Sequence, residues 1–214
     1  MGYALLIQKC MAQGDREWWI STLRESVEHF REKNRPEREK WVVAEFLKNL
    51  GVQYSAAELS RGSDPPDVIF RDANFEVMDV HDPGRRVHGE YKKALKLVES
   101  AETPDDVRRA VVEDSDPEDI RPAECGDRLR DAQRGKEKRY SAPDKARLDL
   151  LAYISLTERR LVNDQMPDPS LFGDMGWRSV SAVYCNASMV FYAAADAPQF
   201  LREKAGTLTG KTFE

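Results

Sequence analysis

Two carboxylates in the first half of the chain, Asp67 and Glu76, have the spacing of a metal-binding pair. Each stands in or beside a short apolar run, at residues 68–70 and 75–78, and the turn-like residues 71–74 separate the two runs. Acidic residues are poor strand formers and are costly to bury without a partner, so two of them in a hairpin require a reason. Binding one or two hard divalent cations is such a reason, because oxygen ligands suit Mg²⁺ and Mn²⁺.

The register of this hairpin decides which carboxylates face each other. A turn centred on residues 71–72 places Asp67 opposite Glu76. A turn centred on residues 72–74 instead places Asp67 opposite Asp79. Since side chains alternate between the two faces of a strand, a slip of one residue moves an acid to the other side of the sheet. The sequence leaves both registers open.

Helices and further strands are expected around the hairpin. Residues 18–33 and 36–50 repeat apolar residues at three- and four-residue steps, which predicts two amphipathic helices, and Gly51 is a natural end for the second. After the hairpin, the pattern predicts a helix over 89–100, a buried strand over 148–156, a strand pair over 179–195 and a short helix over 198–204.

The composition favours one core with large charged surfaces. The 214 residues carry a net charge of −5, and 33% of them are charged. We expect an N-terminal helical segment at 1–34 and a main domain at 35–214, with a charged insertion at about 101–145 where hydrophobic residues are sparse. Residues 99–127 hold eleven acidic and three basic side chains, whereas residues 128–147 hold eight basic and three acidic ones. The basic segment is either a nucleic-acid contact or a solvated helix face.

Nothing in the sequence predicts a membrane partner. No apolar run approaches the roughly 20 residues of a membrane-spanning helix, and the N-terminus lacks the features of a secretion signal. The three cysteines are far apart and odd in number, which indicates reduced thiols and a cytoplasmic protein. A protein partner is also possible on such a charged surface, and the oligomeric state stays open.

The acidic hairpin resembles the motif of the PD-(D/E)xK (restriction-endonuclease-like) nuclease superfamily, with Asp67 as the D and Glu76 as the E. A weak strand or connector is also expected over 52–59, and with it the expected element order matches the α-β-β-β-α-β core of that superfamily. More narrowly, the chain resembles a small bacterial family of candidate endonucleases with no assigned substrate. That likeness is carried by Arg-Pro-Glu-Arg-Glu at 35–39, Glu-Phe-Leu at 45–47, Leu-Gly at 50–51, Pro-Pro-Asp-Val at 65–68, Phe-Glu-Val at 75–77 and Asp-Pro-Gly-Arg-Arg at 82–86.

The resemblance implies an α/β fold with a restriction-endonuclease-like core, which is a mixed sheet flanked by helices. The N-terminal helix and a charged, partly helical insertion are added to this core. It also implies that Asp67, Glu76 and the Val77 carbonyl hold Mg²⁺ or Mn²⁺ for hydrolysis of a phosphodiester. A glutamate of the preceding helix often completes such a site. Glu39 is the first candidate, because it shares a helical face with the apolar residues that are expected to meet the sheet, and Glu45 is the second.

The lysine position of the motif, two residues after Glu76, holds Met78, which carries no charge and donates no hydrogen bond. Members of the superfamily can take a cation from elsewhere, and Arg85 is the first candidate here. The other candidates in the same region are Arg86, His88, Lys92 and Lys93. Loss of one well-placed donor typically costs about two to three powers of ten in rate.

Three functions follow from these patterns. The first is a metal-dependent endonuclease acting on nucleic acid, slowed by Met78. The second is a catalytically inactive nuclease fold that binds nucleic acid or protein. The third is a regulatory partner protein that docks through its acidic insertion. Fold alone does not decide among them.

Overall fold

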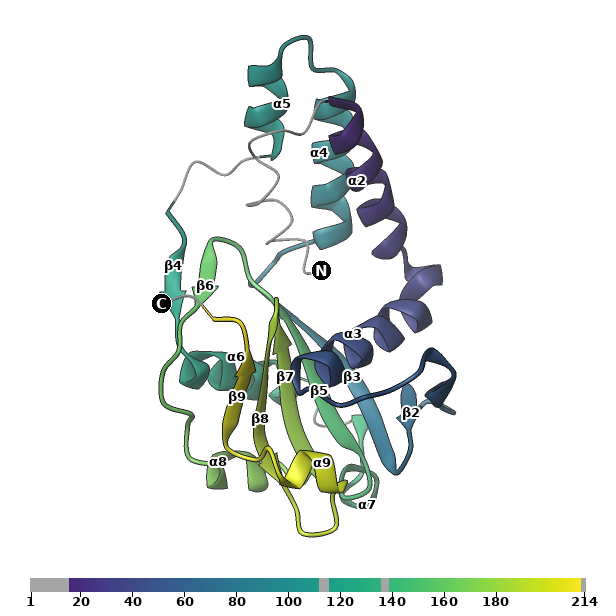
Figure 1. Ribbon diagram of the computed structural model, residues 1–214, viewed down its shortest axis with the longest axis vertical. Helices are drawn as coiled ribbons and strands as arrows, with labels where there is room; N and C mark the ends of the chain where they lie inside the picture. The colour runs from purple at the N-terminus through teal and green to yellow at the C-terminus, as the bar shows by residue number, and fades with distance from the viewer. Residues whose placement is uncertain (1–15, 112–115, 136–138, 213–214) are drawn as a thin grey trace. The chain divides into compact units, whose positions relative to one another are not determined.

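The computed structural model describes residues 16–111, 116–135 and 139–212, and the chain forms two compact units (Figure 1). The first comprises Met1–Arg38 and Asp82–Asp116, and the second comprises Glu39–His81 and Pro117–Glu214. The second unit is therefore built from two separate stretches of chain. The functional division expected between residues 34 and 35, with an insertion at 101–145, stays a prediction.

The first unit is helical in its described residues. Its elements are α2 (Arg16–His29), the short helix η1 (Glu32–Asn34), α4 (Val87–Glu99) and α5 (Pro104–Val111). An apolar cluster joins the three longer helices, and its buried members are Trp19, Ile20, Leu23, Val98 and Val107. Helices α2 and α4 confirm the two helices predicted over 18–33 and 89–100.

Helix α3 (Arg35–Asn49) leads into the second unit and confirms the helix predicted over 36–50. Its end is fixed by two hydrogen bonds, from the Val52 amide to the Leu47 carbonyl and from the Gly51 amide to the Lys48 carbonyl. Gly51 has a φ of 73°, a left-handed conformation that costs glycine little. The glycine therefore ends the helix as its position in the sequence predicts.

The centre of the second unit is a seven-stranded mixed sheet, with the spatial order β1-β2-β3-β5-β7-β8-β9. The strands are β1 (Leu59–Arg61), β2 (Val68–Phe70), β3 (Ala73–His81), β5 (Asp149–Ser155), β7 (Ser179–Tyr184), β8 (Ala187–Ala193) and β9 (Thr207–Gly210). Strands β3, β5 and β7 run parallel, and the outer neighbours pair antiparallel. The α/β class, the central strand and the C-terminal strand pair are confirmed.

The β2–β3 hairpin adopts the first of the two expected registers. Val68 pairs with Phe75 and Phe70 pairs with Ala73, so the turn consists of Arg71 and Asp72. This is the turn position expected for the register that brings Asp67 towards Glu76. The alternative register, with Asp79 opposite Asp67, is wrong, because it requires a turn centred on residues 72–74 and the observed turn is residues 71–72.

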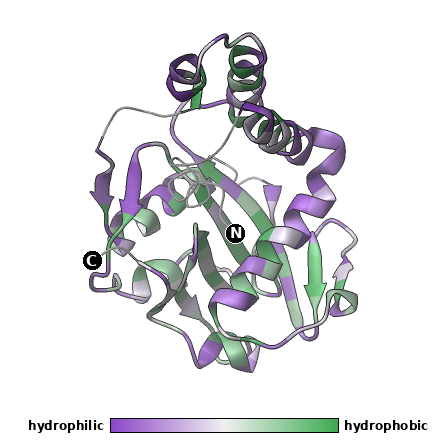
Figure 2. Ribbon diagram, turned by 45° about the horizontal axis from the view of Figure 1, so that its top comes forward, coloured by the Kyte–Doolittle hydropathy of each residue, from purple (hydrophilic) through white to green (hydrophobic). Residues whose placement is uncertain are grey.

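The two faces of the sheet bury different apolar clusters. On one face, Phe75 and Val77 of β3 pack with the buried side of α3, and Phe46 meets Phe75 edge to face with ring centroids 5.8 Å apart. Because side chains alternate along a strand, Glu76 and Met78 point to the opposite face. Figure 2 shows how strongly the apolar residues concentrate on the strands of the sheet.

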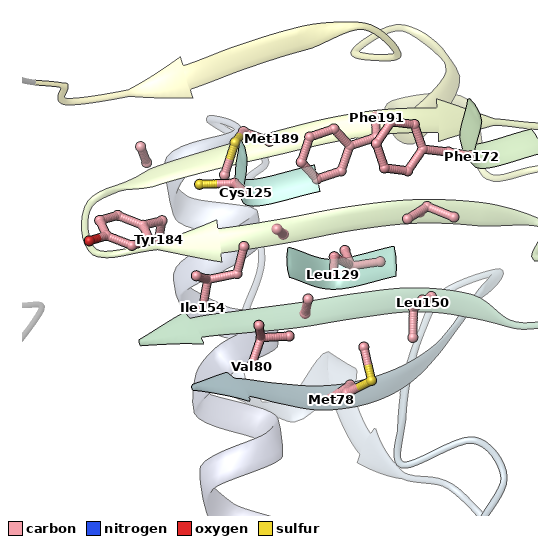
Figure 3. Packing of buried hydrophobic residues seen from close by; sticks show 14 of the residues in the cluster. Met78, Val80, Cys125, Leu129, Leu150, Ile154, Phe172, Tyr184, Met189 and Phe191 are labelled. Carbon is pink, nitrogen blue, oxygen red and sulfur yellow. The ribbon is translucent and has the colours of Figure 1, made fainter. Parts of the chain in front are cut away.

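On that opposite face, Met78 and Val80 of β3 pack with Leu150 and Ile154 of β5 and with residues of helix α6 (Pro122–Arg134), as Figure 3 shows. The remaining described elements are β4 (Glu118–Ile120) paired with β6 (Arg159–Leu161), and the short helices η2 (Ala56–Glu58), α7 (Ala142–Lys145), α8 (Ser170–Gly173) and α9 (Gln199–Arg202). Among the described residues, no helix has the length and apolar character needed to cross a bilayer.

Candidate metal centre

The loop between β1 and β2 presents two aspartates, Asp64 and Asp67. The Gly62 amide donates to the Asp67 carbonyl at 3.0 Å, and the Asp64 amide donates to the Pro66 carbonyl at 3.1 Å, so the loop closes on itself. A β-carbon on Gly62 would lie 1.9 Å from the Pro66 carbonyl oxygen. Only glycine therefore allows the backbone to approach this closely.

The hairpin holds Asp67 and Glu76 in place. The Asp67 amide donates to the carbonyl of Phe75, the strand partner of Val68, at 3.0 Å, one residue out of the register of the ladder. The Asp67 carboxylate in turn accepts a hydrogen bond from the Val77 amide at 2.9 Å. Both carboxylates are buried, with 7% of Asp67 and 3% of Glu76 exposed. The acids predicted from the sequence are therefore brought together inside the protein.

Asp64 completes a group of three carboxylates. One oxygen from each of Asp64, Asp67 and Glu76 lies within 4.8 Å of the others, and Asp64 is the exposed member. Asp64 was not a site candidate in the sequence, although it stands three residues before Asp67 in the Pro-rich turn. Among the residues that the structure describes, no other group of three or more His, Cys, Asp or Glu side chains is close enough together to hold a metal ion.

Tyr140 and Arg139 reach the same group from a distant part of the chain. The Tyr140 hydroxyl donates a hydrogen bond to Oε1 of Glu76. Arg139 Nη2 lies 3.3 Å from Asp64 Oδ1 and 4.0 Å from Glu76 Oε1. Neither residue was a site candidate in the sequence, where the only signal was their place in the basic segment 128–147.

The environment of Glu76 favours its neutral form. Burial raises the pKa of Glu76 from an ordinary 4.5 to about 7, and the charges of Asp67 and Asp64 act in the same direction. The hydrogen bond from Tyr140 and the charge of Arg139 oppose that rise. Burial and the bond to Glu76 also raise the pKa of Tyr140, so its hydroxyl keeps its proton at neutral pH. A cation bound nearby would therefore lower the pKa of Glu76 and favour its ionised form.

Asp149 shows how a purely structural acid in this sheet is satisfied. It is fully buried at the start of β5 and accepts hydrogen bonds from the Arg178 guanidinium, the Ser179 hydroxyl at 2.9 Å and the Asn74 amide at 2.9 Å. Glu76 differs, because its Oε2 atom is buried with no hydrogen-bond partner among the described residues. A buried acceptor without a hydrogen-bond partner needs an explanation, and binding of a cation by this oxygen is one explanation.

The other predicted site residues, Glu39, Glu45 and Arg85, are not members of the group of three carboxylates. Glu39 is buried on α3, the helix that packs on the face of the sheet opposite Glu76, and it is not a member of the carboxylate group. Glu45 pairs with Lys48 at 3.3 Å. Arg85 belongs to the first unit, where it pairs with Glu90 at 2.9 Å. Roles for Glu39 and Arg85 stay predictions.

Met78 occupies the lysine position as a core residue. It lies on the same face as Glu76, but only 4% of it is exposed, and it packs in the cluster with Leu150 and Leu129 (Figure 3). The position therefore contributes to stability in this chain, and any cation at the acidic group must come from another segment.

The residues present fit a hard divalent cation. Three carboxylates, two of them buried, offer the oxygen ligands that Mg²⁺ and Mn²⁺ prefer, and the open Oε2 of Glu76 is a ligand atom without another use. The group contains no histidine, whereas the facial triad of non-haem iron oxygenases requires two.

Comparison with known proteins agrees with part of this description. The sequence model of a family described as "Putative endonuclease, protein of unknown function" matches residues 18–212. A solved structure from Pseudomonas aeruginosa, described as a protein of unknown function of the monooxygenase superfamily, is 27% identical with a TM-score of 0.66. That likeness covers 99% of this chain and 97% of the other. None of the curated proteins matches the sequence.

Proposed function

The chain belongs to this family, and from that premise we propose that it is a metal-dependent endonuclease that hydrolyses phosphodiester bonds of nucleic acid. The observation that carries the proposal is the meeting of Asp64, Asp67 and Glu76 within 4.8 Å, two of them buried and one with an unused oxygen. Such a group is costly in a folded protein unless a cation binds it.

The order of elements supports a restriction-endonuclease-like core. Within the second unit, helix α3 is followed by the antiparallel strands β1, β2 and β3, then by helix α6 and the parallel strand β5, with the short elements β4 and α7 on either side of α6. This matches the α-β-β-β-α-β order of that superfamily, with Asp67 directly before the second strand and Glu76 in the third. The monooxygenase description applies to the Pseudomonas protein, and the carboxylate-only group favours hydrolysis here.

Each residue of the group has a distinct task in this proposal. Asp67, Glu76 and Asp64 would hold Mg²⁺ or Mn²⁺, with the Val77 carbonyl as a further ligand. The bound ion would supply an activated water and offset charge on the scissile phosphate. The Val77 amide fixes one oxygen of Asp67, and the Tyr140 hydroxyl fixes one oxygen of Glu76, so each carboxylate keeps one oxygen directed by the protein.

A second function has one observation in its favour. Because Met78 is buried in the core instead of providing a cation, the chain could bind nucleic acid or a protein partner at the acidic group without turnover. Metal binding is common to both functions, and only a cleavage assay separates them.

Calorimetric titration with Mn²⁺ tests the proposal, using the wild type, Asp67→Asn and a control. Asparagine keeps an acceptor for the Val77 amide but removes the charge. The matched control is Asp72→Asn, the same change at an exposed position of the same hairpin. We expect Mn²⁺ binding in the wild type and the control and its loss in Asp67→Asn. We also expect cleavage of labelled DNA or RNA that follows the same pattern. Equal Mn²⁺ binding by all three proteins would contradict the proposal.

A further inference from the structure

Arg139 is placed where the acidic group needs a cation. Its Nη2 atom lies 3.3 Å from Asp64 Oδ1 and 4.0 Å from Glu76 Oε1. About 42% of its side chain is exposed, so the guanidinium borders both the carboxylates and the solvent from which a substrate arrives. In sequence it belongs to the basic segment 128–147, far from the hairpin.

The position of Arg139 is anchored by its neighbour. The Tyr140 ring packs edge-on against the buried Trp177 ring, with centroids 5.1 Å apart, and its hydroxyl bonds to Glu76. The Arg139 guanidinium also lies over the Tyr140 ring, 5.3 Å from the ring centroid. Tyr140 therefore fixes the segment to the core, and the residue before it presents a positive charge beside the carboxylates.

Divalent cation binding changes what Arg139 can do. In the metal-free protein its positive charge offsets the carboxylates of Asp64 and Glu76. A divalent cation on the same carboxylates would satisfy them and repel the guanidinium. A planar guanidinium released in this way is suited to bind a phosphate through two parallel hydrogen bonds.

We propose that Arg139 supplies the cation that the motif lysine supplies elsewhere in the superfamily, by binding the phosphate of the substrate beside the metal-loaded carboxylates. This inference rests on the proposed nuclease function. It assigns a substrate-binding role to a residue outside the acidic hairpin, and it is compatible with a core methionine at position 78.

The test compares Arg139→Gln and Arg139→Lys with Arg147→Gln. Arg147 is the matched control, because it belongs to the same basic segment and is 67% exposed, but it pairs with Asp144. Three quantities are measured for each protein. They are Mn²⁺ affinity by calorimetry, affinity for a fluorescent oligonucleotide in Ca²⁺ over a range of salt concentrations, and cleavage of that oligonucleotide in Mn²⁺.

We expect Arg139→Gln to bind Mn²⁺ at least as tightly as the wild type, because a competing positive charge is gone. Its oligonucleotide affinity should fall about tenfold, with a salt dependence reduced by about one phosphate contact, and cleavage should fall about a hundredfold or more. Arg139→Lys should recover most of the affinity, and Arg147→Gln should resemble the wild type.

Two results would overturn the inference while leaving the nuclease intact. One is an Arg139→Gln protein that binds and cleaves like Arg147→Gln. The other is a protein that loses Mn²⁺ affinity and thermal stability together, which would make Arg139 a structural ion-pair residue. If the wild type itself neither binds nor cleaves the oligonucleotide, the proposed function fails and this inference fails with it.

Discussion

Tyr140 donates a hydrogen bond to one oxygen of Glu76 from a position 64 residues later in the chain, while the second oxygen of Glu76 is buried with no hydrogen-bond partner in the described part of the chain. The protein thus fixes one half of the carboxylate and leaves the other half for a ligand. Because the tyrosine bond lowers the pKa of Glu76 against the effect of burial, the two residues jointly set the pH at which the site can take a cation.

Tyr140→Phe should raise the pH at which Mn²⁺ binds. Without the phenol donor, the ionised form of Glu76 loses a hydrogen bond, so its pKa rises further above about 7. We expect the midpoint of the pH dependence of Mn²⁺ affinity to move upward by about half to one unit. Calorimetric titrations across a pH series measure it. An unchanged or lower midpoint would show that the tyrosine does not control this proton.

Glu76→Gln should stabilise the metal-free protein at alkaline pH. The pKa of Glu76 is about 7 in the folded protein against 4.5 when unperturbed, so the folded state holds the proton more tightly. Its contribution to stability is complete below pH 4.5 and is lost as the pH rises through about 7. Glutamine cannot ionise and still accepts from Tyr140.

Urea unfolding in EDTA measures this difference. At about pH 8 we expect Glu76→Gln to exceed the wild type by on the order of 2 kcal/mol, and near pH 4 the gap should close. The matched control is Glu32→Gln at an exposed position, which should follow the wild type at both pH values. A constant gap between Glu76→Gln and the wild type would contradict the linkage.

Met78→Lys should be destabilising, because an ammonium group replaces a side chain that is 4% exposed in the core. We expect a loss of about 2–4 kcal/mol in the free energy of unfolding. The control Met189→Lys, at a fully buried position of the same cluster, should lose more, since Met78 has Glu76 two residues away on its face. Equal losses would mean that the lysine at 78 cannot reach the acid.

Gly62→Ala should disturb the loop that carries Asp64 and Asp67, because the new methyl group would lie 1.9 Å from the Pro66 carbonyl oxygen. We expect the free energy of unfolding to fall by about 2–4 kcal/mol and Mn²⁺ affinity to fall about tenfold. In Gly89→Ala, the nearest atom is 3.7 Å away in a helix, so stability should hold or rise slightly. Unchanged Mn²⁺ affinity in Gly62→Ala would separate the loop from the site.

The acidic hairpin was predictable because its determinants are local. A two-residue turn sets the register, and alternation then places Asp67 and Glu76 on one face. The helices with a clear apolar period and the central strand 148–156 were predictable for the same reason. Strand β9 (Thr207–Gly210) was missed, because four residues, only one of them apolar, at the edge of a sheet carry no usable alternation.

The remainder of the site depends on contacts that no local pattern encodes. Tyr140 and Arg139 stand in the basic segment 128–147, whose composition fits either a solvated helix face or a nucleic-acid contact, and they meet Glu76 from 64 and 63 residues later in the chain. A cation from residues 85–93 stays a prediction, because these residues belong to the first unit and the carboxylates to the second.

The order of the site residues along the chain is also the order in which they are synthesised. Asp64, Asp67 and Glu76 leave the ribosome together, whereas Tyr140 and the neighbouring strand β5 emerge only after the whole of 82–116 has been made. Before Tyr140 and β5 have been made, Glu76 has neither its phenolic donor nor this neighbouring strand, so we expect the three carboxylates to stay hydrated until a late stage of synthesis.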